Sequence, residues 1–180
     1  MKSDQLEHVL RAGARILEQA DFLVVGSAAI LGSVDDAVLP LEASRSDEAD
    51  LAPFDDPDGS KSMQIEGALG QGSQFHSTFG YYADGVDFGT AMAPAGWQDR
   101  LVRFATEGSM PGRGWCLEPH DLAASKLAAG RPKDYEFVES LLGAGLIDLE
   151  LLGRRIDELP RERVIPAFLA RARAWVKTQG

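Results

Sequence analysis

A short apolar run that ends at a Gly-Ser pair is the feature that most constrains this fold. Residues 22–25, Phe-Leu-Val-Val, are β-forming and predict a short buried strand that stops at Gly26. Residues 4–19 before the run carry apolar side chains at helical spacing. Ser27 after the run opens a stretch of small residues that suits a short helix packed closely on the strand. The chain is therefore predicted to begin as a helix, a strand and a sharp turn into a second helix.

The rest of the chain mixes strand and helix patterns first and then becomes helical. Further short strands are predicted at residues 39–41, 48–51, 100–104 and 115–117, and a helix at 63–69. Residues 73–90 are aromatic and glycine-rich, which is typical of strands or an ordered loop. Later helices are predicted at residues 121–129, 135–142, 149–156 and 165–176. This order predicts an α+β fold (mixed α/β), with a core of short mixed sheet and flanking helices at residues 1–117 and a helical part packed on it at residues 118–180.

Charge is concentrated in one part of the chain. The protein has 18 basic and 28 acidic residues, a net charge of −10, and residues 35–66 alone hold ten acids against two bases. An acidic protein does not bind polyphosphate backbones through bulk electrostatics, whereas a local acidic block can hold divalent cations that recruit phosphates. A solvated acidic loop that only aids solubility is the alternative.

Two further features bound the class of protein. The single cysteine, Cys116, cannot form an internal disulfide, which excludes a secreted cystine-rich scaffold. The charge-free run at residues 22–34 is too short to cross a bilayer, so we expect no membrane partner. The expected compartment is the cytoplasm.

A pair of acids on the strand at residues 48–51 is the first candidate for chemistry. Glu48 and Asp50 are separated by one residue, so in a strand their side chains point to the same face. Two such carboxylates can share divalent cations, and Mg²⁺ held in this way supports phosphoryl or nucleotidyl transfer. The alternative is an edge strand whose charges discourage aggregation.

Two other segments suggest contact with an anion. Gly26-Ser27 follows the buried strand and would expose backbone N–H groups to a phosphate, although such a pair is commonly just a tight turn. Lys126 stands alone among Ala and Leu residues of a predicted helix, where it either extends to solvent or reaches an anionic ligand. Arg131 and Asp134 follow at the junction with the next helix, where an ordinary salt bridge is the alternative.

Together these segments resemble a known superfamily. Val25-Gly26-Ser27, Glu48-x-Asp50 and Lys126-x4-Arg131-x-Lys133-Asp134 occur in this order, with Phe75-His76-x-Thr78-Phe79-Gly80-Tyr81-Tyr82 and Gly96-Trp97-x-x-Arg100-Leu101 between the last two. The pattern is similar to the minimal nucleotidyltransferases of the polymerase-β-like superfamily. It resembles in particular a small bacterial nucleotidyltransferase family without an assigned substrate, akin to the toxin nucleotidyltransferases of the AbiEii type.

The resemblance implies a role for each matching position. Gly26 and Ser27 would contact a nucleoside triphosphate, while Glu48 and Asp50 would bind Mg²⁺ or Mn²⁺ in place of the more common Asp-x-Asp. Lys126 would offset phosphate charge during catalysis, with Arg131 and Asp134 as its polar surroundings in the nucleotide site. For the third carboxylate of the superfamily, a metal ligand that helps to activate the attacking hydroxyl, Asp87 is the first candidate and Asp84 the second.

The resemblance also implies a function, in two alternatives. The first is an enzyme that transfers a nucleotidyl group from a nucleoside triphosphate to a hydroxyl acceptor, either an RNA end or a protein side chain, as a component of a toxin–antitoxin pair. The second is a catalytically degenerate member of the fold that acts as a binding or regulatory partner, such as an antitoxin. Arginines of the C-terminal helices could contact the acidic block of a second copy, so an oligomer is an open alternative to simple exposed helix faces.

Overall fold

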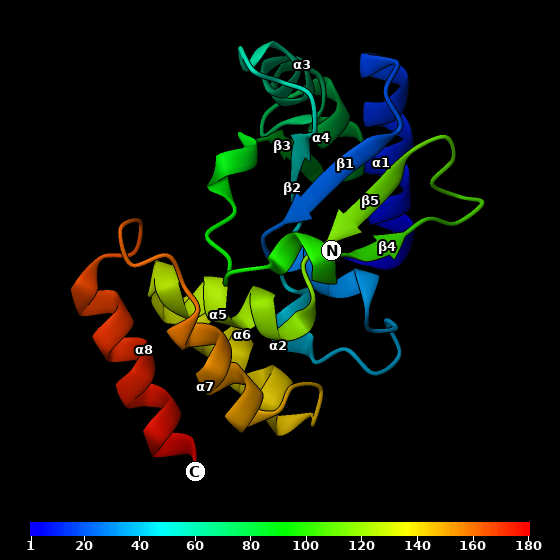
Figure 1. Ribbon diagram of the computed structural model, residues 1–180. Helices are drawn as coiled ribbons and strands as arrows, with labels where there is room; N and C mark the ends of the chain where they lie inside the picture. Colours follow the sequence, from blue (N-terminus) through cyan, green and yellow to red (C-terminus); the bar gives the residue numbers. More distant parts are fainter.

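The computed structural model describes residues 1–180 as an α+β fold built on one five-stranded sheet (Figure 1). The strands are β1 (Asp21–Val25), β2 (Glu48–Pro53), β3 (Tyr82–Gly85), β4 (Val102–Phe104) and β5 (Arg113–Cys116). Their order across the sheet is β3-β2-β1-β5-β4. β1 is antiparallel to β2 and parallel to β5, β2 is parallel to β3, and β4 is antiparallel to β5. The sheet is therefore mixed, which confirms the predicted fold class.

Helices surround the sheet. The α-helices are α1 (Ser3–Leu17), α2 (Leu41–Ser44), α3 (Ser60–Leu69), α4 (Gln74–Phe79), α5 (Pro119–Ala129), α6 (Pro132–Gly143), α7 (Leu149–Asp157) and α8 (Pro166–Gln179). The short 3₁₀-helices are η1 (Ser27–Gly32), η2 (Phe88–Thr90) and η3 (Trp97–Arg100). Not one of these helices combines the length and the apolar character that crossing a membrane requires.

The N-terminal elements form because their apolar side chains share one interior. Leu6 and Leu10 recur at helical spacing on α1 and are fully buried. Phe22 of β1 points to the same interior: a side chain added at Gly13 of α1 would touch both Phe22 and Ile65 of α3. α1 and α3 therefore cover the face of the sheet to which Phe22 points. Because side chains alternate along a strand, the neighbouring residues of β1 point to the opposite face.

The four C-terminal helices pack together beside the end of the sheet (Figure 1). α5 contacts α6, α7 and α8, and it also packs against η1, which follows β1. Arg100 of η3 donates two hydrogen bonds, of 2.8 and 3.0 Å, to the buried carboxylate of Asp121 on α5. One continuous apolar core includes residues of the sheet and of these helices. The helical part is therefore held against the sheet by apolar packing, and against η3 by the ion pair of Arg100 with Asp121.

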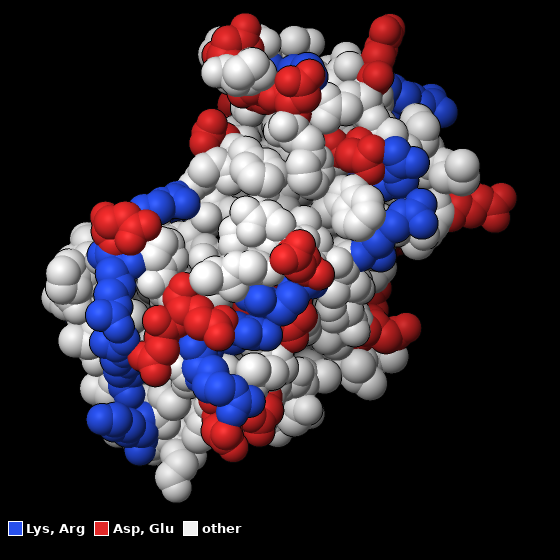
Figure 2. All heavy atoms as spheres, viewed as in Figure 1, with Lys and Arg blue, Asp and Glu red and all other residues white.

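Several arginines of the helical part are paired within it. Arg155 lies 3.1 Å from Asp121 and 3.0 Å from Glu158, and Arg173 lies 2.7 Å from Asp157. Figure 2 shows basic side chains along α7 and α8 with acidic side chains beside them. Much of this basic charge is therefore balanced inside the chain.

The prediction of a strand at residues 39–41 is wrong. Residues 36–38 form a turn, and Leu41 begins the short helix α2 with 69% of its surface exposed. Pro40 has no N–H to donate to a sheet, and the apolar side chain beside it is not buried. Apolar composition alone therefore misled the prediction here.

Residues 73–90 contain a helix, although their composition predicts strands or an ordered loop. α4 begins after Ser73, whose hydroxyl accepts a hydrogen bond of 3.1 Å from the backbone N–H three residues later. Phe75 and Phe79 lie one turn apart, and their ring centres are 4.9 and 4.6 Å from that of His8 on α1. The N-cap and this aromatic contact outweigh the β-forming composition of the segment.

Candidate active site

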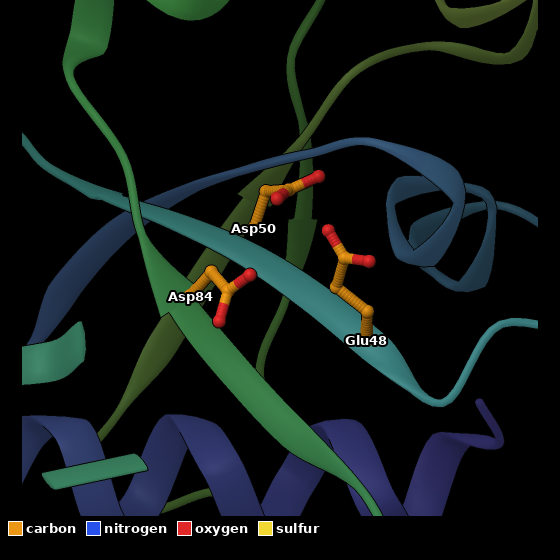
Figure 3. Close-up of side chains that lie close together, drawn as sticks. All are labelled: Glu48, Asp50 and Asp84. Atoms are coloured by element: carbon orange, nitrogen blue, oxygen red, sulfur yellow. The ribbon is translucent and has the colours of Figure 1, made fainter. Parts of the chain in front are cut away.

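Two neighbouring strands bring three carboxylates together. Glu48 and Asp50 alternate along β2 and share a face, and Asp84 on β3 is paired in register with Asp50. The oxygens that the three residues can offer to one ion all lie within 4.8 Å of one another (Figure 3). Mg²⁺ and Mn²⁺ bind carboxylate oxygens of this kind. The donor set of this acidic cluster, Glu48, Asp50 and Asp84, therefore fits a divalent metal ion.

The electrostatics of the acidic cluster also favour a cation. Burial, together with the neighbouring charge of Glu48, raises the pKa of Asp50 to about 7. Burial raises the pKa of Asp84 as well, although the backbone N–H of Gln71 donates to its Oδ1 at 3.2 Å and opposes that rise. Carboxylates this close repel one another, and a cation between them removes the repulsion.

Gly26 brings the backbone directly against the acidic cluster. Its φ is +67°, a left-handed conformation that favours glycine, and a Cβ at this position would collide with the carboxylate of Asp50. Val25 is paired in register with Asp50, so the end of β1 lies beside the start of β2. Ser27 begins η1 immediately after the turn. The Gly-Ser pair therefore lies next to the acidic pair, although 20 residues of chain separate them in the sequence.

Lys126 reaches the same place from α5. Its Nζ donates a hydrogen bond of 2.9 Å to Ser27 Oγ, lies 3.6 Å from Asp134 Oδ1 and stands 5.4 Å from the centre of the Phe137 ring. Burial lowers the pKa of Lys126, and the charge of Asp134 opposes that effect. Arg131 holds Asp134 through two side-chain hydrogen bonds of 2.7 and 3.1 Å. The lysine is therefore fixed at the turn after β1 and does not extend to solvent.

A cavity of about 400 Å³ connects these groups. Glu48 and Asp50 line it from the sheet, and Lys126, Arg131 and Lys133 line it from the helical part. A volume of this size suits a small-molecule ligand. Because acidic and basic side chains both face the cavity, its chemistry suits an anionic ligand that arrives with a divalent cation.

The sequence also matches a family model. Residues 4–164, well over half of the chain, match the family DUF6036, which is described as a nucleotidyltransferase of unknown function. The chain belongs to DUF6036. Comparison with curated proteins and with solved structures gives no match. Membership confirms the resemblance inferred from the motifs and supports nucleotidyltransferase as the general kind of protein.

Of the two candidates for a third carboxylate in this DUF6036 protein, the structure places Asp84 in the acidic cluster, and Asp87 is not part of it. Asp87 is exposed and lies beyond the end of β3, where its carboxylate accepts a hydrogen bond of 2.6 Å from the backbone N–H of Gly89 and caps η2. Asp84, the second candidate, is the acid that joins Glu48 and Asp50. The pairing of β3 with β2 makes the difference, because it sets Asp84 opposite Asp50 and ends before Asp87.

Sequence reasoning missed one residue at the acidic cluster of this DUF6036 protein. The Tyr82 hydroxyl donates a hydrogen bond of 3.2 Å to Glu48 Oε2, and the two residues are paired in register. Burial and the charges of Glu48 and Asp84 raise the pKa of Tyr82 to about 12. The sequence does carry a signal for this residue: Tyr82 stands two positions before Asp84, which puts both side chains on one face of a strand.

Proposed function

We propose that this DUF6036 protein is an enzyme that transfers a nucleotidyl group from a nucleoside triphosphate to a hydroxyl acceptor, with Mg²⁺ or Mn²⁺ as its metal. One observation carries the proposal: Glu48 and Asp50 of the acidic cluster, the Gly26-Ser27 turn and Lys126 line one cavity, although they come from three distant segments. Membership of a nucleotidyltransferase family supports the same reaction type.

Each group has a role that its position suits. Glu48, Asp50 and Asp84 hold the metal, which would stabilise charge on the transferring phosphate and on the leaving pyrophosphate. Gly26 and Ser27 receive the phosphates beyond the point of transfer. Lys126 offsets their charge, and because Ser27 and the Asp134–Arg131 pair already hold it, little ordering is needed when the nucleotide binds.

The proposal takes the acceptor and the biological setting from the resemblance to the toxin nucleotidyltransferases. The acceptor is an RNA end or a protein side chain, and the protein is a component of a toxin–antitoxin pair in the cytoplasm. The proposal also divides the chain into a nucleotidyltransferase core at residues 1–117 and a helical part at residues 118–180. Residues of both parts line the cavity, so the helical part contributes to nucleotide binding rather than standing apart from it.

The alternative of a degenerate binding or regulatory protein has lost its main support. An irregular third acid favours that alternative, because glycines lie close to both Asp87 and Asp84 in the sequence, and a net charge that repels RNA favours it as well. Asp84 lies on a regular strand, in register with Asp50, and supplies a third acid without Asp87. We therefore favour the hypothesis of an active enzyme.

Calorimetric titration with each of the four ribonucleoside triphosphates, with and without Mg²⁺, tests the proposal. We expect Mg²⁺-dependent binding that is lost in the double variant Glu48→Gln/Asp50→Asn. The matched control is Asp87→Asn, which changes a nearby acid outside the cluster and should bind as the wild type does. If the folded wild-type protein binds no nucleotide at millimolar concentration, the enzyme proposal fails and the degenerate alternative stands.

A further inference from the structure

A hydroxyl group of the chain itself lies at the acidic cluster. Tyr82 Oη is 3.2 Å from Glu48 Oε2, and the side chain stands on the same face of β3 as Asp84. The ring centre lies 4.7 Å from that of His76, which follows the N-cap of α4. The phenol is therefore hydrogen-bonded to Glu48 and in contact with the His76 ring while remaining partly exposed.

The order of the strands places this hydroxyl opposite the Gly-Ser turn. Gly26 and Ser27 follow β1, Glu48 and Asp50 lie on the neighbouring β2, and Tyr82 lies on β3 beyond it. Ser27 and Lys126 line the cavity on the β1 side, whereas Tyr82 and Asp84 are not part of its lining. In a nucleotidyl transfer the attacking oxygen and the leaving pyrophosphate lie roughly in line on opposite sides of the α-phosphorus. With the pyrophosphate at Ser27 and Lys126, the attacking oxygen comes from the side where Tyr82 stands.

We propose that Tyr82 is an acceptor of the protein's own nucleotidyl transfer, so that the chain nucleotidylates itself at this residue. The inference rests on the proposed function of the site. A lone pair of Tyr82 Oη forms the new bond to the α-phosphorus of a nucleoside triphosphate. The bond from that phosphorus to the β-phosphate oxygen breaks, its electron pair leaves with pyrophosphate, and the phenolic proton passes to the carboxylate of Glu48. The product is a tyrosine phosphodiester of the nucleoside.

The neighbouring tyrosine provides a matched control. Tyr81 precedes β3, and its hydroxyl is 2.7 Å from His8 Nδ1 on α1. It therefore has the same chemistry as Tyr82 but belongs to the aromatic contact between α1 and α4. Replacing either residue with phenylalanine removes one hydroxyl and keeps the ring.

Intact-protein mass spectrometry tests the proposal after incubation with Mg²⁺ and each nucleoside triphosphate. We expect a mass increase of one nucleoside monophosphate, located on Tyr82 by peptide fragmentation, kept in Tyr81→Phe and lost in Tyr82→Phe. If calorimetry shows Mg²⁺-dependent nucleotide binding but no adduct forms, or if the adduct persists in Tyr82→Phe, self-nucleotidylation at Tyr82 is wrong and the proposed function stands. If no nucleotide binds, both proposals fail.

A binding measurement without nucleotide checks the placement of the phenol independently of turnover. Removing a hydrogen-bond partner of a metal-binding carboxylate weakens metal binding by about tenfold or more. We therefore expect Tyr82→Phe to lower the Mn²⁺ affinity of the protein by about that factor, and Tyr81→Phe to leave it unchanged. Equal Mn²⁺ affinity in wild type and Tyr82→Phe would place the hydroxyl away from the metal-loaded carboxylates and overturn the proposal.

Discussion

Replacing Asp50 with asparagine should stabilise the folded protein at alkaline pH when no divalent cation is present. The pKa of Asp50 is raised to about 7 by burial and by the charge of Glu48, against about 4 in an unfolded chain. Between these two pH values the native state keeps a proton that the unfolded chain has released, so the free energy of unfolding falls as the pH rises through this window. Asparagine carries no charge at any of these pH values, so the variant does not lose this stability as the pH rises.

The size of the effect follows from the pKa shift. About three pKa units correspond to on the order of 4 kcal/mol. Because Glu48 shares the repulsion and the cluster is partly open to solvent, we expect about 1–3 kcal/mol of added stability at about pH 8. For a chain of this size that is a rise of roughly 3–10 °C in the midpoint of thermal unfolding. At about pH 5 the carboxyl is protonated in the folded wild type but already ionised in the unfolded chain, so about a third of the difference should remain, and it vanishes only below about pH 4.

Thermal unfolding at several pH values, with and without Mg²⁺ or Mn²⁺, provides the assay. The metal should stabilise the wild type at about pH 8 and leave Asp50→Asn nearly unaffected, because a ligand that binds only the native state shifts unfolding by mass action. Asp87→Asn is the control, since asparagine can still cap η2, and it should keep the wild-type response. A difference between Asp50→Asn and wild type that is equal at about pH 5 and about pH 8 would refute the argument from repulsion.

Three further predictions concern the backbone, the core and the thiol. Gly26→Ala should abolish nucleotide binding, measured by calorimetry, because its Cβ collides with a cluster carboxylate; Gly72→Ala has a similar positive φ but open space and should bind normally. Asp121→Ala should lower the free energy of unfolding, measured in urea, by about 3–5 kcal/mol, since it leaves Arg100 without its buried partner. Cys116, fully buried with its pKa raised to about 12, should react with a thiol reagent only as urea unfolds the protein.

Helices and strands could be predicted from the sequence where the spacing of apolar residues is regular. The strand at residues 22–25 and the helices around Leu10 and Leu127 were correct because the spacing of apolar side chains reports which face is buried. The segment around Phe75 was not predicted as a helix, because a cap and a contact with α1 decided it. Contacts with a distant helix leave no trace in local composition.

The candidate site divides in the same way. Glu48 and Asp50 could be placed on one face of a strand from their spacing alone, since that depends only on the alternation of side chains. The position of Lys126 on a helix was also predictable, but its hydrogen bond to Ser27 was not, because the two residues are 99 positions apart. The sequence left two outcomes open for this lysine, and packing of α5 against η1 decided between them.

The sequence by itself determined the strand at residues 22–25, the sharp Gly-Ser turn after it and the spacing of the acidic pair on one face of a strand. Only the tertiary structure decided which acid completes the cluster and which hydroxyl lies beside it. Asp84 rather than Asp87, and Tyr82 rather than Tyr81, are selected by the register of β3 on β2. Strand register depends on the pairing of segments far apart in the chain, and a shift of one residue exchanges the two faces of a strand.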